Sequence, residues 1–321
     1  LMFMAGLESD LDLLKKYLKP ATSVALFGVI APIILVYLLG RIYNFTNEEA
    51  IFLGVTFAAT SVSISVEVLK ELKKLDTKEG TTILGAAVID DILAVLILSV
   101  LVSIFSDVAQ AEGGHTQSNL GVGILIQVIY FIGIYLVFRW IAPLLMKISE
   151  KLPISSSEIL MSLVICLGMA FFADLVGLSA VVGSFFAGVA VAQTPYKQEI
   201  DSSIEPIGYA VFIPMFFVSI GLNMTFKGLL TNWLFIVILL VLALLTKWGG
   251  CGLGAKMLGI IGAGMVSRGE MALIIAQVGY EAHLLSDKFY SSVIIVIILT
   301  TIIAPFMLKS AIMRQAKAEA K

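Results

Sequence analysis

Long apolar runs separated by short polar stretches follow one another along most of the 321-residue chain. A helix needs about 20 apolar residues to cross a hydrocarbon core of about 30 Å. The pattern therefore predicts an all-α polytopic membrane protein. Two of the candidate segments, 179–195 and 205–223, are short for a full span. The candidate segments are 20–40, 48–72, 78–106, 119–146, 156–174, 179–195, 205–223, 231–257, 261–283 and 288–310.

Lysine and arginine are divided unevenly between the two ends of these segments. Most of the 21 basic residues lie in loops on the side that faces residues 9–20, whereas the other side holds only Arg41, Lys227 and Lys288. Loops that stay in the cytoplasm carry an excess of Lys and Arg, so we assign the first side to the cytoplasm. We expect residues 1–19 to be the end of a truncated membrane helix followed by a cytoplasmic loop.

Two segments have polar or small residues at their centres. Segment 48–72 reads GVTFAATSVSIS there, and segment 261–283 reads GMVSRGEMAL. Such clusters at membrane depth fit broken helices whose freed backbone groups line a protected cavity. The alternative is close helix packing through small residues, which is weaker for the second segment because packing does not require Arg268 or Glu270.

The order of the segments predicts an inverted repeat. Each interrupted segment is the middle member of three, and the two triplets enter the membrane from opposite sides. Transporters of this design bind their substrate near the midplane, between discontinuous helices. The triplets are 20–40, 48–72 and 78–106, and then 231–257, 261–283 and 288–310.

Two adjacent carboxylates, Asp90 and Asp91, lie near the centre of segment 78–106. A charged residue at that depth costs at least about 2.5–3.5 kcal/mol on insertion scales, and intramembrane acids usually mark ion or proton sites. The alternative, a solvated turn, is disfavoured because no Gly, Pro or Asn flanks the pair. Neighbours on a helix point about 100° apart, so one acid can face a cation while the other faces a cavity.

Three further charges fall inside the segments. Lys247 is too far from the end of its segment to extend to the interface, so we expect it to pair with a carboxylate. We expect Arg268 and Glu270 to pair with each other or with Glu67, as a structural charge network.

Composition agrees with this interpretation. The chain is 59% hydrophobic and 14% charged, whereas soluble domains carry about 25% charged residues. The net charge of −2 does not suggest a nucleic-acid partner. Cys166 and Cys251 lie in apolar segments and are expected to be packing residues, and no cofactor is expected.

The glycines of residues 249–256 resemble a phosphate loop, but Ala255 stands where that motif needs Lys, so we expect helix packing there.

Five stretches together resemble the monovalent cation:proton antiporter-2 family, and within it NapA-type bacterial sodium/proton antiporters. They occur in the family's order as AATSVSISVEVLKEL, GAAVIDDILAVLIL, PMFFVSIGLNM, LLTKWGGCGLG and MVSRGEMALIIA. The resemblance implies an inverted-repeat antiporter fold with two crossed discontinuous helices, located in the bacterial inner (plasma) membrane. It also implies a homodimer within the lipid bilayer.

The resemblance implies a division of labour along the chain. The core, or ion-translocation, domain would comprise 20–106 and 229–321, with a linker helix in 107–150 and part of a dimerisation domain in 151–228. Within the core, Asp91 matches the aspartate that binds Na⁺ transiently or a proton. Asp90 matches the acid that pairs with the core lysine, Lys247, and hydroxyls near Thr60 and Ser61 would help to coordinate the ion.

The function we expect is secondary active exchange of Na⁺ (or Li⁺) for H⁺, with both competing for Asp91, and not an enzymatic activity. The Asp-Asp pair favours this over the potassium efflux relatives, which usually carry Gln-Asp. A K⁺/H⁺ antiporter or K⁺ efflux system of the same family and a passive cation channel stay as alternatives. A remote alternative is an intramembrane aspartyl protease, but its two aspartates would have to face each other from separate helices, which Asp90 and Asp91 cannot do.

Overall fold

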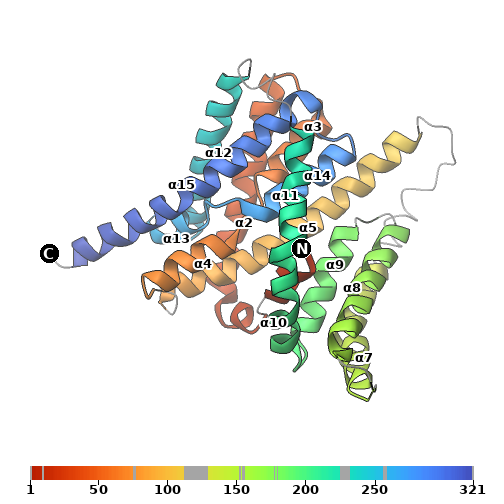
Figure 1. The fold of residues 1–321 in the computed structure, drawn as a ribbon. Helices are drawn as coiled ribbons and strands as arrows, with labels where there is room; N and C mark the ends of the chain where they lie inside the picture. Colours follow the sequence, from red (N-terminus) through yellow and green to blue (C-terminus); the bar gives the residue numbers. More distant parts are fainter. Residues whose placement is uncertain are drawn as a thin grey trace. The chain divides into compact units, whose positions relative to one another are not determined.

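The computed structural model of the chain describes residues 2–8, 11–74, 77–111, 129–151, 153, 156–176, 178, 180–224, 232–255 and 259–319. Every regular element within these residues is a helix (Figure 1). Seven of the described helices are long and apolar enough to cross a membrane, and Ala180–Ala192 is a shorter apolar helix. The predicted all-α polytopic architecture is confirmed.

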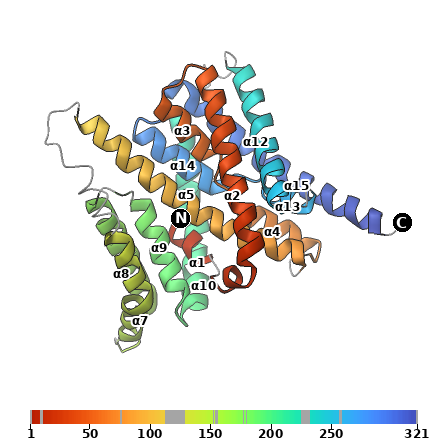
Figure 2. The same ribbon diagram turned by 180° about the vertical axis from the view of Figure 1, so that it is seen from behind.

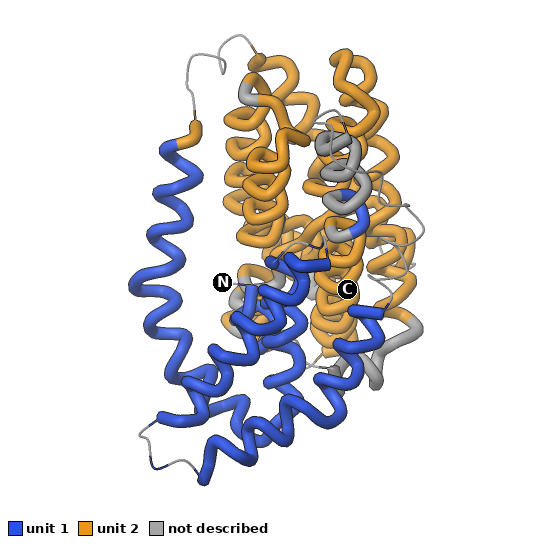
Figure 3. The backbone as a smooth tube through the Cα atoms, turned by 90° about the vertical axis from the view of Figure 1, so that its right-hand side faces the viewer, with its two compact units in different colours: residues 1–10, 99–222 blue, residues 11–98, 223–321 orange. Residues whose placement is uncertain are grey.

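The chain forms two compact units, which Figure 3 shows in different colours. Unit 2 comprises residues 11–98 and 223–321, and therefore contains both predicted triplets except the end of segment 78–106. Its helices are α2 (Leu11–Ile42), α3 (Asn47–Thr56), α4 (Val62–Glu71), the first part of α5 (Lys78–Ala111), α12 (Trp233–Gly254), α13 (Ile260–Gly264), α14 (Gly269–Glu281) and α15 (Asp287–Glu319).

Unit 1 comprises residues 1–10 and 99–222. Residues 129–136 are also helical and continue into η1, so that residues 129–149 form one apolar span. The helices of unit 1 are α1 (Met2–Glu8), the rest of α5, the π-helical turn η1 (Val137–Ile141), α7 (Ala142–Ser149), α8 (Ser157–Leu175), α9 (Ala180–Ala192), α10 (Lys197–Ile207), the π-helical turn η2 (Gly208–Phe212) and α11 (Ile213–Asn223).

Both segments predicted to be interrupted are broken helices. The first divides into α3 and α4, with residues 57–61 between them, and the second into α13 and α14, with residues 265–268 between them. The start of α3 is fixed by Thr46, whose side chain accepts a hydrogen bond from the Glu49 N–H while the Glu49 side chain accepts one from the Thr46 N–H. This reciprocal cap satisfies backbone donors that a helix start leaves without partners.

Two predicted boundaries were wrong. Segment 205–223 belongs to a 27-residue span that begins at Lys197 and passes through η2 to Asn223. A count of apolar residues misses its first turns because they carry polar residues such as Glu199 and Asp201. Helix α2 begins at Leu11, so residues 11–19, which were expected to be a loop, are helical.

Close packing of α2 against α12 brings the two triplets together within unit 2 (Figure 2). A Cβ atom on Gly250 would lie 2.7 Å from the Phe27 carbonyl oxygen, and one on Gly254 would lie 2.7 Å from the Ser23 carbonyl oxygen. The Ser23 hydroxyl donates a 2.9 Å hydrogen bond to the Gly254 carbonyl. Gly250 and Gly254 therefore serve helix packing, as predicted for this stretch, because only small residues allow two membrane helices to approach so closely.

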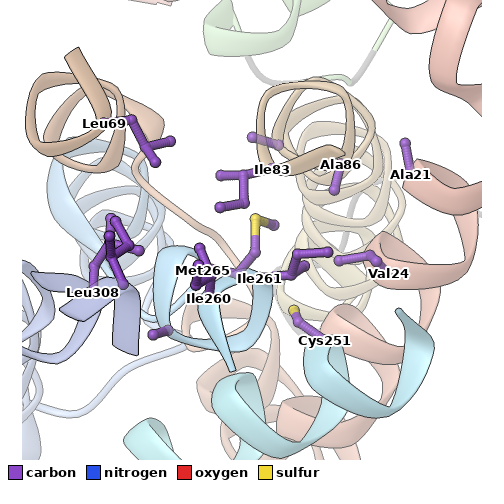
Figure 4. Close-up of a cluster of buried hydrophobic side chains, with 13 residues drawn as sticks. Ala21, Val24, Leu69, Ile83, Ala86, Cys251, Ile260, Ile261, Met265 and Leu308 are labelled. Atoms are coloured by element: carbon purple, nitrogen blue, oxygen red, sulfur yellow. The ribbon is translucent and has the colours of Figure 1, made fainter. Parts of the chain in front are cut away.

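An apolar cluster fills the part of unit 2 that lies toward the predicted cytoplasmic ends of its helices. Figure 4 shows side chains from several helices converging there, including Val24 of α2, Leu69 of α4, Ile83 of α5, Cys251 of α12 and Leu308 of α15. All five are buried. Because side chains of several helices pack together in this cluster, it holds in place the helices that carry the polar residues described next.

Candidate functional site

The two helix breaks meet inside unit 2. The Ser61 N–H donates a 2.8 Å hydrogen bond to the Ser267 carbonyl, and the Ser65 hydroxyl donates one of 2.5 Å to the Gly264 carbonyl. These bonds join backbone groups that the interrupted helices leave unpaired, which must be satisfied at membrane depth. The sequence favours breaks here because small and hydroxyl residues allow close contact and offer side-chain partners to the backbone.

A buried ion pair lies beside this crossing. The Lys247 ammonium of α12 is 2.6 Å from Oδ2 of Asp90 of α5, and both side chains have no exposed surface. The Thr60 hydroxyl from the first break also donates a hydrogen bond to Asp90. Asp90 is therefore the acid that pairs with the lysine, as the resemblance implied. The other carboxylate oxygen of Asp90, Oδ1, has no hydrogen-bond partner among the described residues.

Asp91 is the next residue of α5 and differs from Asp90 in its surroundings. Its side chain is partly exposed, whereas that of Asp90 is buried. It points about 100° away around the helix, whereas Asp90 forms the ion pair with Lys247. The two adjacent acids thus differ in burial, with Asp90 fully buried and Asp91 partly exposed.

A third carboxylate comes from the second break. Glu270, in the first turn of α14, accepts a 2.9 Å hydrogen bond from the Ser61 hydroxyl. Gly269 precedes it with φ of +41°, and a Cβ atom there would lie 2.2 Å from Cβ of Ser61. Glycine is needed at this position for both its positive φ and its lack of a side chain. The Gly269 N–H is bound by the Thr301 hydroxyl at 3.2 Å.

The hydrogen bonds described for Arg268 go to main-chain oxygens. Its fully buried guanidinium donates hydrogen bonds to the carbonyl oxygens of Ala59, at 3.3 Å, and Ala243, at 2.7 Å. It also lies 5.7 Å from the centre of the Phe57 ring. The expected pairing of Arg268 with Glu270 stays a prediction, because the described contacts join Arg268 to main-chain oxygens and Glu270 to the Ser61 hydroxyl. The side chain of Glu67 lies outside the described residues, so its expected part in this network is not described.

Charge balance gives the site its chemical character. Three carboxylates and two cationic side chains come together around the crossing, and they are Asp90, Asp91, Glu270, Lys247 and Arg268. When all five are ionised, one negative charge is left in excess. A single monovalent cation or a single proton would remove this excess. Among the described residues, no group of three His, Cys, Asp or Glu side chains is placed to hold a metal ion.

Several site contacts could not be read from the sequence. Ser65 and Thr301 bind main-chain groups of the second break, although only the clustering of hydroxyls in segment 48–72 hinted at the former. The carbonyl of Ala243 is an acceptor for Arg268. Every residue has a carbonyl group, so no residue type could have signalled this role.

Comparison with known proteins gives a consistent result. A family model described as sodium/hydrogen exchanger, transmembrane, matches residues 1–314. A Na⁺/H⁺ antiporter of Enterococcus hirae is 52% identical over 96% of this chain and 81% of its own length. The Na⁺/H⁺-K⁺ antiporter GerN of Bacillus cereus is 45% identical over 96% of this chain and 80% of its own length.

Among solved structures, the sodium proton antiporter MjNhaP1 of Methanocaldococcus jannaschii superimposes with a TM-score of 0.61. The match covers 96% of this chain and 80% of that one at 13% sequence identity. At this level of identity the likeness concerns the fold, which is the antiporter fold that the sequence predicted.

Proposed function

This chain belongs to the sodium/hydrogen exchanger family, and we propose that it exchanges Na⁺ for H⁺ across the membrane, with both substrates competing for Asp91. The family is one of transporters, and the chain is a multi-pass bacterial membrane protein. One observation carries the residue-level proposal. Asp90 is fully buried and held by Lys247 and Thr60, while the adjacent Asp91 is partly exposed.

A hard monovalent cation prefers oxygen ligands, and Thr60 of the first break supplies a hydroxyl oxygen beside Asp90, the neighbour of Asp91. We propose that the hydroxyls of Thr60 and Ser61 complete the coordination, together with main-chain carbonyls of the first break. In the structure both hydroxyls donate to carboxylates. A hydroxyl that donates its proton keeps two lone pairs, so these bonds orient the oxygens and leave them able to coordinate an ion.

Competition between ion and proton follows from the charge balance. Either a Na⁺ ion or a proton on Asp91 neutralises the excess negative charge of the site, and both together would leave an uncompensated positive charge in a low-dielectric environment. Binding of one therefore expels the other. Lys247 either holds Asp90 throughout the cycle or gives up its own proton when the ion binds.

We propose that unit 2 carries the ion, corresponding to the core ranges 20–106 and 229–321, and that it moves while unit 1 supports it. Unit 1 would contain the linker helix of 107–150 and the dimerising part of 151–228. Its α8 exposes large apolar side chains, including Leu163, Leu167 and Phe171. Such a face suits contact with lipid and with a second copy of the chain in a homodimer.

Exchange of K⁺ is the second candidate, because the name of the Bacillus cereus relative includes both Na⁺ and K⁺. The protease alternative is disfavoured by geometry, since Asp90 and Asp91 are consecutive residues of one helix. A catalytic pair must instead share a proton or water across the scissile bond from facing positions.

The test uses purified protein in proteoliposomes with a preset pH gradient, to which Na⁺, Li⁺ or K⁺ is added while a pH-sensitive dye reports dissipation. We expect Asp91→Asn to abolish cation-dependent dissipation, while Asp201→Asn, the same change in a partly exposed residue of α10, leaves it intact. Proton-coupled Na⁺ flux that survives in Asp91→Asn would show that Asp91 is not the carrier. Flux of cations without proton movement would indicate a channel.

A further inference from the structure

Unit 2 carries a second feature, separate from the charged site. A groove of about 630 Å³ runs between α12, α13 and α15. This volume falls within the range of about 300–1,000 Å³ typical of sites for small molecules. One part of the groove is apolar and is lined by Trp248, Phe306 and Met307. The other part is polar and is lined by Ser310, Arg314 and Gln315.

By the orientation that the distribution of basic residues predicts, the polar part lies at the cytoplasmic surface of the membrane. The span that contains it runs over 28 residues, from Lys288 to Gln315, which is about 42 Å of helix at 1.5 Å per residue. A hydrocarbon core of about 30 Å cannot cover that length, so the last turns reach the headgroup layer. Phe306 precedes Arg314 by two helical turns, about 12 Å nearer the membrane centre. The groove therefore leads from the headgroup layer into the acyl-chain region.

Charge distinguishes this groove from its surroundings. The side chain of Arg314 is exposed, and within the part of the chain that the structure describes no carboxylate forms an ion pair with it. Lys309, on the same helix, is directed instead toward Glu71, with 3.9 Å between Nζ and Oε1. Arg314 thus presents its guanidinium, which can bind two oxygens of a phosphate, at the end of an apolar channel.

A second groove serves as an internal comparison. It lies between α2 and α12 and is lined only by apolar residues, among them Leu35, Leu38, Val237 and Val241. A site without a cation offers nothing to a phosphate. The groove at Arg314 combines acyl-chain and headgroup contacts, whereas the groove between α2 and α12 offers acyl-chain contacts alone.

We propose that the groove between α12, α13 and α15 binds one anionic phospholipid of the cytoplasmic leaflet. Its phosphate lies against Arg314, with Ser310 and Gln315 as polar neighbours, and an acyl chain lies along Trp248 and Phe306. Basic pockets between membrane helices on the cytoplasmic side are a recurrent way to recognise anionic lipids. Because the groove is formed by helices of unit 2 alone, the lipid would remain bound to that unit during transport.

Trp248 provides a direct probe, since it lines the groove and the chain has three tryptophans. The other two, Trp140 and Trp233, are exposed, and replacing both by Phe leaves Trp248 as the single fluorophore. This parent is reconstituted into vesicles of phosphatidylcholine and phosphatidylglycerol in a fixed ratio. In one series the phosphatidylglycerol carries bromine atoms half-way along its acyl chains. In the other series the phosphatidylglycerol is unbrominated, and an equal amount of the phosphatidylcholine carries the bromine atoms. Surface charge is then identical, and only the identity of the quencher changes.

We expect brominated phosphatidylglycerol to quench Trp248 at about one fifth of the concentration that brominated phosphatidylcholine requires, because one basic residue near the surface favours an anionic lipid about fivefold. Arg314→Gln should remove this preference. Lys309→Gln, which deletes the same charge from the same helix but does not line the groove, should retain it. Equal melting temperatures of the variants confirm that each is folded.

Four results would overturn the proposal. Equal quenching by both lipids in the parent would mean that the groove holds only unselected annular lipid. The absence of quenching by either lipid would mean that a protein segment covers the groove. Reversal of the preference by added inorganic phosphate would show that Arg314 binds a soluble anion and not a lipid. Loss of the preference in Lys309→Gln to the same extent as in Arg314→Gln would reduce the effect to general surface charge.

Discussion

Neutralising Asp90 should destabilise the protein strongly, because it leaves the ammonium of Lys247 buried without a counter-charge. Both side chains are fully buried and their charged atoms are 2.6 Å apart. At an effective dielectric constant of about 20, two unit charges at 2.6 Å attract by about 6 kcal/mol. Asp90→Asn keeps the shape and a carbonyl dipole, so part of this is retained, and removal of one partner from a buried pair typically costs about 3–5 kcal/mol.

A double-mutant cycle separates this electrostatic loss from other effects of the substitution. Lys247→Gln alone should also destabilise, because it leaves the Asp90 carboxylate buried with only the Thr60 hydroxyl. The double variant should recover most of the loss, since Asn and Gln are neutral and can hydrogen-bond to each other. Replacing a buried pair by uncharged groups of similar size is often close to neutral in stability.

The assay is thermal unfolding of the purified protein in one detergent, followed by tryptophan fluorescence. A loss of about 3–5 kcal/mol should lower the melting temperature by about 10 °C in each single variant. The double variant should melt within a few degrees of the wild type. The argument would be refuted if Asp90→Asn melted like the wild type, or if the double variant lost the sum of the two single losses.

Two other consequences can be measured. Gly269→Ala should lower the melting temperature, because it places a Cβ atom 2.2 Å from Cβ of Ser61 at a residue with positive φ. Gly249→Ala should not lower it, because a Cβ atom there meets no atom within 4 Å. Equal melting temperatures for these two variants would contradict the reasoning. If the proton of Lys247 is released during the cycle, Lys247→Gln should retain partial exchange that no longer responds to an imposed membrane potential. Wild-type exchange that is already insensitive to potential would exclude that role.

The sequence predicted those features that depend on depth and periodicity. Ten apolar segments place the centres of 48–72, 78–106 and 261–283 at similar membrane depth, and the breaks and Asp90 do meet there in unit 2. Residue type also limited the partners of a deep lysine to the few deep carboxylates, which is why Lys247 could be assigned to the acidic pair before any contact was known.

Partners that carry no residue signature could not be predicted. Arg268 also donates to the carbonyls of Ala59 and Ala243, and these contacts depend only on backbone geometry at the break and on the approach of α12. The start of the span at Lys197 was missed for a related reason. Polar residues in the first turns of a helix look like a loop when only hydrophobicity is counted.

The helix breaks also explain how a site with five charged side chains can respond to one ion. Arg268 binds the Ala59 carbonyl just beyond the end of α3, where a helix carries partial negative charge, and Glu270 lies in the first turn of α14, where a helix carries partial positive charge. These two residues are matched to helix ends, so they can stay ionised throughout a cycle. The two aspartates and Lys247 remain, again with one negative charge in excess. A Na⁺ ion and a proton on Asp91 then give the same total charge, and exchange moves net charge only if Lys247 also changes its protonation.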